Sequence, residues 1–182
     1  MSPPDDKESV LTESRESSQT AVHKHVPKQR ILYSKVAPEA YQALVGVQRY
    51  VDHKTDLPES MLELVRMRAS QINGCAYCLD MHSKDARAEG ETEQRLYVLD
   101  AWREAPFYTD KERAALAWTE AVTLVSESHV PDDIYEEARK YFNEKELVDL
   151  TMAIIAINSW NRLSISMRTL SGTYQTTKHR NT

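Results

Sequence analysis

Glycine and cysteine are scarce in this chain of 182 residues, and each scarcity excludes a class of protein. Only four glycines are present, well below the usual share of about 7%. That disfavours a turn-rich β-sandwich or barrel, and any glycine loop that cradles a phosphate. The two cysteines lie three positions apart, so they cannot form the disulfide framework of a small secreted domain. Cysteines this close together are more typical of a reactive site than of a structural disulfide.

An excess of basic charge and a long apolar run are also absent. The 23 basic and 28 acidic side chains give a formal net charge of −5, which argues against binding nucleic acid through a basic face. The longest apolar run, near residues 152–157, is far shorter than the roughly 20 residues of a membrane span. The first thirty residues carry several acids and no apolar core of a signal peptide. We therefore expect a cytoplasmic protein with reduced thiols, acting without a membrane or a nucleic-acid partner.

Composition divides the chain into three segments. Residues 1–30 are rich in serine, threonine, proline and mixed charge without hydrophobic periodicity, which predicts a disordered tail. Residues 171–182 are polar as well and predict a second, shorter tail. Residues 31–170 have the length of one domain.

The central segment predicts an all-α domain of about seven helices. Prolines at 38 and 58 suit the first turn of a helix, and Gly90 suits a helix end. Thr109 and Glu112 have the spacing of a capping box. No segment shows the period of two expected of a strand. The last helix is apolar on nearly every side over 152–157, which predicts a central helix or one shared with a second subunit. The expected ranges are 38–53, 58–73, 75–89, 92–104, 109–125, a short helix from 131, and 143–168.

The informative stretch is Asn-Gly-Cys-Ala-Tyr-Cys-Leu-Asp-Met-His at 73–82. Cys75 follows a helix-breaking Asn-Gly and lies in the first turn of the next helix, where free amides and the helix dipole favour a thiolate. Cys78 follows one turn later, within reach of a disulfide. His82 follows Cys78 by four residues on the same face. One helical stripe therefore carries a nucleophile, a resolving thiol and a base.

Glu63 is the fourth candidate, twelve residues before Cys75 on the preceding helix. If the two helices fold back at the Asn-Gly, Glu63 comes level with His82. A carboxylate there would orient the imidazole and raise its basicity. Attack by a thiolate requires proton transfers, which such a relay supplies at neutral pH.

These residues also have readings without catalysis. A Cys-x-x-Cys pair can be half of a zinc site, and Cys75, Cys78, His82 and Glu63 would make four ligands. The two thiols could also be inert core residues, because free cysteine is often buried as a small hydrophobic side chain. Glu63 and Arg66 have the spacing of an ordinary surface ion pair. The three tryptophans, at 102, 118 and 160, are expected to anchor the core or an interface.

The pattern of a glutamate, eleven residues and Cys-x-x-Cys-x-x-x-His resembles a known family. The stretch 62–103 is similar to the alkylhydroperoxidase D-like (AhpD-like) core of the carboxymuconolactone decarboxylase family, with weaker similarity over 37–168. The resemblance implies an all-α fold that assembles as a homotrimer or homohexamer. It implies Cys78 as the peroxide-attacking thiolate and Cys75 as the resolving thiol, with Glu63 and His82 moving the protons. It requires no cofactor and no metal.

Two departures qualify the resemblance. Well-characterised hydroperoxidases of the family carry a histidine where this chain has Tyr77, and a phenol is a donor but a poor base at neutral pH. The founding decarboxylases lack the cysteine pair, so the pair counts against a lactone decarboxylase. The dipole argument favours Cys75 as the attacking thiolate and the resemblance favours Cys78, so the order of the two stays open.

The function predicted is that of a thiol-dependent peroxidase. A thiolate displaces an alcohol from a hydroperoxide, and the sulfenic acid condenses with the second cysteine. An external dithiol, on a lipoylated or thioredoxin-like protein, then resets the pair. Two alternatives are a non-redox lyase of the carboxymuconolactone decarboxylase type, and a binding module whose cysteines sense redox state or hold zinc.

Overall fold

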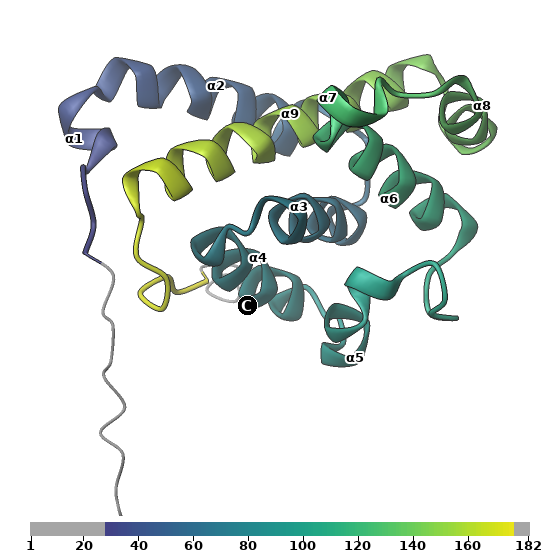
Figure 1. Ribbon diagram of the computed structural model, residues 1–182, viewed down its shortest axis with the longest axis horizontal. Helices are drawn as coiled ribbons and strands as arrows, with labels where there is room; N and C mark the ends of the chain where they lie inside the picture. Colours follow the sequence, from purple (N-terminus) through teal and green to yellow (C-terminus); the bar gives the residue numbers. More distant parts are fainter. Residues whose placement is uncertain (1–27, 177–182) are drawn as a thin grey trace, which may run out of the picture.

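The computed structural model describes residues 28–176, and over this range the protein is all-α, with nine α-helices, one short 3₁₀ helix and no strand (Figure 1). The helices are α1 (Tyr33–Val36), α2 (Pro38–Lys54), α3 (Glu59–Asn73), α4 (Ala76–Ala88), α5 (Glu93–Tyr97), η1 (Leu99–Ala101), α6 (Asp110–Thr123), α7 (Val125–Ser128), α8 (Asp132–Tyr141) and α9 (Glu144–Met167).

The all-α prediction is confirmed, but seven helices was too few. Both α1 and α7 have four residues, too few to show a helical period in the sequence. The single helix expected over 92–104 was wrong: α5 ends at Tyr97 and η1 follows. The buried side chains here recur every third residue, which matches the three-residue turn of a 3₁₀ helix better than an α-helix. They are Leu96, Leu99, Trp102, Ala105 and Tyr108.

Helix ends follow the capping signals in the sequence. Thr109 and Glu112 form the predicted capping box of α6, and Asn143 and Glu146 form an equivalent one on α9. Gly74 ends α3 in the left-handed conformation at φ 70°, a backbone state that glycine adopts at little cost. The chain therefore reverses sharply between α3 and α4.

Helix α3 lies at the centre of the fold and packs against α4, α6 and α9 (Figure 1). Nine of its 15 residues are buried, including Glu63 and Arg66. Helix α9, the helix predicted to be central, packs on α2, α3 and α6 but keeps an open face. Val148 and Ile155 on that face are 59% and 45% exposed.

A buried amide network joins α3 to α9 beside the α3–α4 turn. The Asn73 side-chain amide donates to the side-chain oxygens of Asn158 and Asn161, at 2.9 Å each. Asn161 in turn donates to the Ser70 hydroxyl at 3.0 Å. Because these donors and acceptors satisfy one another in the interior, the network fixes the turn that precedes Cys75.

Both ends of the described chain contact the helical body. The Arg30 backbone N–H donates to the Met167 carbonyl at 2.9 Å. The Gly172 N–H donates to the Asp80 carboxylate, and the Tyr174 hydroxyl donates to Asp85. Residues 1–27, most of the first predicted tail, and residues 177–182, half of the second, lie outside the described residues. The boundaries at 30 and 171 therefore stay predictions.

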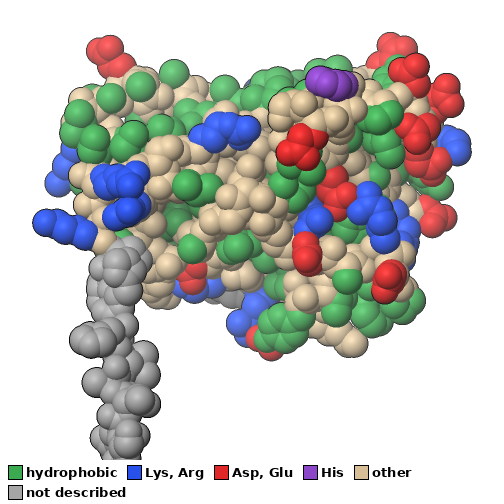
Figure 2. All heavy atoms as spheres, in the orientation of Figure 1, with side chains coloured by type: hydrophobic (Ala, Val, Ile, Leu, Met, Phe, Trp, Pro, Cys, Tyr) green, Lys and Arg blue, Asp and Glu red, His purple; other side chains and the backbone are tan. Residues whose placement is uncertain are grey.

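Charge is distributed unevenly over the surface. Figure 2 shows acidic side chains gathered at the end where α8 lies, and lysine and arginine side chains at the end where α1 and the last turn of α9 lie. Among the helices of residues 28–176, none is long and apolar enough to cross a membrane.

Candidate functional site

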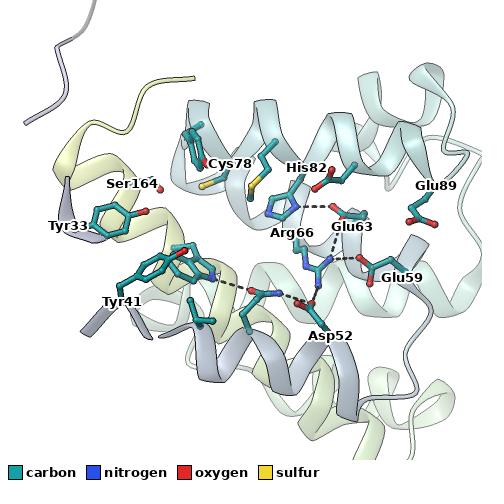
Figure 3. Close-up of a pocket in the computed structure, with 16 residues that line it drawn as sticks. Tyr33, Tyr41, Asp52, Glu59, Glu63, Arg66, Cys78, His82, Glu89 and Ser164 are labelled. Atoms are coloured by element: carbon teal, nitrogen blue, oxygen red, sulfur yellow. Dashed lines mark hydrogen bonds and ion pairs between the residues drawn. The ribbon is translucent and has the colours of Figure 1, made fainter. Parts of the chain in front are cut away.

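A cavity of about 550 Å³ opens beside α4, between two contrasting walls (Figure 3). One wall is apolar and largely aromatic, and it comes from α1, α2, α4 and α9. The other wall is charged and comes mainly from α3 and α4. The apolar wall includes Tyr33, Tyr41, Val45, Tyr77, Met81 and Trp160, and the charged wall includes Asp52, Glu59, Glu63, Arg66, His82 and Asp85.

The two cysteines are joined as a disulfide at the start of α4, with their Cα atoms 5.4 Å apart. Cys75 is the N-cap, and its sulfur lies 3.4 Å from the Cys78 backbone nitrogen. Each residue is 1% exposed. Cys78 lines the main cavity, whereas Cys75 lines a smaller cavity of about 300 Å³. The predicted proximity of the sulfurs is confirmed, and the structure gives them different surroundings.

His82 and Glu63 are in contact, as we predicted for two helices that fold back at the Asn-Gly. The Nδ1 of His82 lies 2.9 Å from the Oε2 of Glu63. The residues are 7% and 1% exposed, so little water competes with this contact. A buried carboxylate on Nδ1 fixes the ring orientation, and it stabilises the imidazolium that forms when the ring accepts a proton.

Arg66 holds the other oxygen of Glu63, at 2.9 Å. The guanidinium also donates to Glu59 and Asp52, at 2.8 and 2.9 Å. Burial alone would lower the pKa of Arg66, but the charges of Glu63 and Glu59 outweigh it and raise the pKa. The Glu63–Arg66 ion pair suggested by the spacing is formed, but it is not at the surface: the arginine side chain is 6% exposed and belongs to the interior of the site. Its permanent charge keeps the Glu63 carboxylate compensated.

Tyr77, the residue between the two cysteines in the predicted motif, forms part of the aromatic wall. Burial raises the pKa of its phenol, with a further contribution from Tyr33 and Tyr41. The hydroxyl is therefore a neutral hydrogen-bond donor at neutral pH. Tyr41 and Trp160 pack edge to face at 5.7 Å between ring centroids. Trp160 thus lines the cavity, while Trp102 belongs to the buried core, as expected.

Asp85 is the site residue that the sequence analysis missed. It is 6% exposed, and one of its carboxylate oxygens lies within 4.8 Å of a His82 ring nitrogen and a Glu63 oxygen. The Tyr174 hydroxyl donates to Asp85 at 2.9 Å. A signal was present, because Asp85 follows His82 by three residues on one helix face. Neither cysteine belongs to this trio, so the four-ligand zinc set considered from the sequence is not the cluster formed by the described residues.

The fold and this cavity define a class: an all-α, AhpD-like protein with a buried Cys-x-x-Cys pair. The model of the carboxymuconolactone decarboxylase family matches residues 38–121. The chain is also 45% identical over 139 residues to the uncharacterized protein YdfG of Bacillus subtilis, covering 76% of this chain and 94% of that protein. The chain belongs to the carboxymuconolactone decarboxylase family.

Two solved structures have a fold similar to that of this chain. One, from Agrobacterium tumefaciens, is a protein of unknown function described as a candidate antioxidant defence protein AhpD. It has a TM-score of 0.78 and 43% identity, over 81% of this chain and all of that chain. The other is the debrominase Bmp8 in complex with 2,3,4-tribromopyrrole, with a TM-score of 0.69 and 22% identity over 76% and 74% of the two chains. At that identity the second likeness shows the fold alone.

Proposed function

We propose that the protein is a thiol-dependent peroxidase that reduces hydroperoxides in the main cavity. The observation that carries this proposal is the common opening of Cys78 and the His82–Glu63 pair into one cavity, with Cys78 bonded to Cys75. A thiol that can cycle with a partner thiol lies beside a group that can move protons. These are the parts that two-electron reduction of a peroxide needs.

The reaction starts from the reduced pair. The Cys78 thiolate attacks one peroxide oxygen, the O–O bond breaks, and the alcohol leaves with a proton delivered by His82. Cys75 then attacks the sulfenic sulfur of Cys78 and displaces water, which forms the disulfide. The hydroperoxide gains two electrons, and the two thiols lose them. Glu63 holds the imidazole in place while it gains and loses the proton.

The different surroundings of the sulfurs support Cys78 as the attacking residue. Cys78 lines the cavity that also contains His82, whereas Cys75 does not. The dipole of α4 favours a thiolate at Cys75, but a thiolate there has no cavity shared with the proton relay. We therefore assign attack to Cys78 and resolution to Cys75. A dithiol carried by a lipoylated or thioredoxin-like protein would close the cycle.

The proposal is tested by counting thiols before and after one equivalent of cumene hydroperoxide is added to reduced, metal-free protein. We expect two thiols to be lost per chain, with a mass decrease of two hydrogens. Cys78→Ser should abolish peroxide consumption. Cys75→Ser should consume one equivalent and stop at a sulfenic acid that dimedone traps. Unchanged consumption by both serine variants would refute the mechanism, and turnover without either thiol would favour the lyase.

A second candidate is the reductive removal of halogen from a planar ring. The aromatic wall formed by Tyr41, Tyr77 and Trp160 favours it, because flat aromatic substrates stack on such side chains. Release of bromide from 2,3,4-tribromopyrrole by the reduced protein would support this candidate. If no bromide is released and hydroperoxide is consumed, the result supports the peroxidase over this second candidate.

A further inference from the structure

The two cysteines of the disulfide line different cavities. The main cavity reaches Cys78, and the second cavity, of about 300 Å³, reaches Cys75. Tyr77 and Ser164 line both cavities, so they form the partition between them. A volume of 300 Å³ is at the lower end of ligand pockets, and suits a small group rather than a large molecule.

Thiol–disulfide exchange has a directional requirement. The incoming thiolate attacks one sulfur from the side opposite the leaving sulfur, through a mixed disulfide. Because Cys75 and Cys78 are each 1% exposed, a thiolate reaches them only through the cavities. Approach through the second cavity meets Cys75 first, with Cys78 behind it as the leaving group. Cys78 would then leave as a thiolate into the cavity that holds His82.

The second cavity has features that favour an anionic ligand. Arg168, which follows the last turn of α9, lines it. The guanidinium of Arg168 makes no ion pair with the residues at 28–176. Thr169 also lines the cavity, and its hydroxyl is buried without a hydrogen-bond partner among the described atoms. The N-terminal end of α4 also contributes a positive potential at Cys75, as the Arg168 guanidinium does. Together they favour the approach of a thiolate.

We propose that the second cavity admits the reductant and that Cys75 is the sulfur it attacks. This inference rests on the proposed function, and it assigns the oxidant and the reductant to opposite sides of the disulfide. One thiolate of a dithiol bonds to the Cys75 sulfur, and the Cys75–Cys78 bond breaks with its electron pair on Cys78. The second thiolate then attacks the reductant's own sulfur and displaces Cys75. The reductant leaves as a disulfide, and both cysteines are reduced.

The attacked sulfur can be identified by trapping. Protein oxidised with diamide, rather than with a peroxide, is mixed briefly with glutathione. Excess N-ethylmaleimide is then added to block the released thiol, and the protein is quenched in acid and mapped by peptide mass spectrometry. We expect glutathione on Cys75 and maleimide on Cys78. Glutathione on Cys78 would overturn the proposal. Because diamide makes the disulfide, this result is independent of whether the protein reduces peroxides.

The entry route can be tested with two variants that each fill one cavity. Ser171 lines the second cavity on an exposed turn, and Val45 lines the main cavity. Ser171→Trp should slow reduction of the disulfide by dihydrolipoamide about tenfold or more, and leave oxidation by hydroperoxide unchanged. Val45→Trp should slow oxidation by hydroperoxide and leave reduction by dihydrolipoamide unchanged. Equal effects of both variants on both half-reactions, or no effect of Ser171→Trp on reduction, would contradict the route.

The source of the thiolate is decided by comparing dihydrolipoamide with reduced thioredoxin in the same assay. Slowing of both by Ser171→Trp supports a common entry for free and protein-borne dithiols. Slowing of one alone identifies that source as the one using the second cavity. Reduction of wild type by both reagents at rates that Ser171→Trp does not change would contradict the proposal.

Discussion

At the scale of single residues, Glu63 is the centre of the site. One carboxylate oxygen contacts the His82 ring and the other contacts the Arg66 guanidinium. The carboxylate is buried, so its charge acts on the imidazole with little screening by water. The neighbouring Arg66 is compensated in turn by Glu59 and Asp52. Removing one charge therefore changes the balance of the whole cluster.

We expect Glu63→Gln to reduce hydroperoxide turnover about 10²–10⁴-fold, the usual contribution of general acid–base catalysis. The amide keeps the size of the side chain but removes the anion that contacts Nδ1 of His82. The assay is peroxide consumption with excess dihydrolipoamide. The matched control is Glu112→Gln, an ion-paired glutamate on α6, remote from the cavity lining. Equal turnover by the two variants would show that Glu63 has no part in proton transfer.

At the scale of elements, the site depends on the sharp reversal between α3 and α4. Gly74 supplies the left-handed residue that ends α3, and Asn161 on α9 anchors the turn by bonding Ser70 and Asn73. This arrangement makes Cys75 the N-cap of α4 and brings His82 level with Glu63. The reversal thus places Glu63 of α3 beside His82 of α4 in the wall of the main cavity.

Replacing Asn161 with alanine should lower the free energy of unfolding by about 1–3 kcal/mol, because the buried Ser70 and the half-buried Asn73 each lose a hydrogen bond. Urea denaturation followed by circular dichroism measures the change. Ser159→Ala, on the outer side of the same helix, serves as the control and should stay within about 0.5 kcal/mol of wild type. A loss no larger in Asn161→Ala than in Ser159→Ala would mean that the amide network contributes little.

At the scale of the whole molecule, the free energy of unfolding should decrease as the pH is lowered into the acid range. Burial would raise the pKa values of Glu112 and Glu120, but hydrogen bonds outweigh it and lower both. The donors are chiefly Arg95 for Glu112 and Trp102 for Glu120. A folded-state pKa below the unfolded value contributes stability above the unfolded pKa, and this contribution disappears as the pH falls through the folded pKa.

We therefore expect the urea midpoint to be lower at pH 3 than at pH 6, with the loss beginning near the ordinary glutamate pKa of about 4.3. Glu120→Gln should show a smaller difference between the two pH values, because one of the responsible groups no longer titrates. A midpoint independent of pH over this interval would exclude the two glutamates as the cause.

The open face of α9 belongs to the same scale. Val148, Met152 and Ile155 follow one another at intervals of three and four residues and form an apolar stripe that the fold leaves partly uncovered. Such a stripe on a helix favours burial against another subunit.

We expect a homotrimer or a homohexamer in sedimentation velocity, and a shift to smaller species for Val148→Asp. The matched change Glu144→Asp on the same helix should leave the assembly intact. A monodisperse monomer at micromolar concentration would contradict the expectation.

The sequence by itself determined the helical class, the N-caps Thr109 and Asn143, and the shared face of Cys78 and His82. These are local properties: capping residues act within one turn, and residues three or four apart share a helix face whatever surrounds them.

The prediction that Cys75 lies in the first turn of the same helix as Cys78 was wrong, because Cys75 is the extended N-cap of α4 and lines the other cavity. The break between α5 and η1 was not predicted, although Leu96, Leu99 and Trp102 have the spacing of three residues that suits a 3₁₀ turn.

Only the tertiary structure decided which neighbours the stripe has. Arg66 reads as a surface residue in the sequence, and it is buried because α2 supplies Asp52 from another part of the chain. Trp160 joins the cavity wall because α9 crosses α2. Cys78 and Cys75 line different cavities, and the end of α9 supplies part of the wall of the second one. Such contacts depend on helix packing between distant segments, and spacing within one helix carries no information about it.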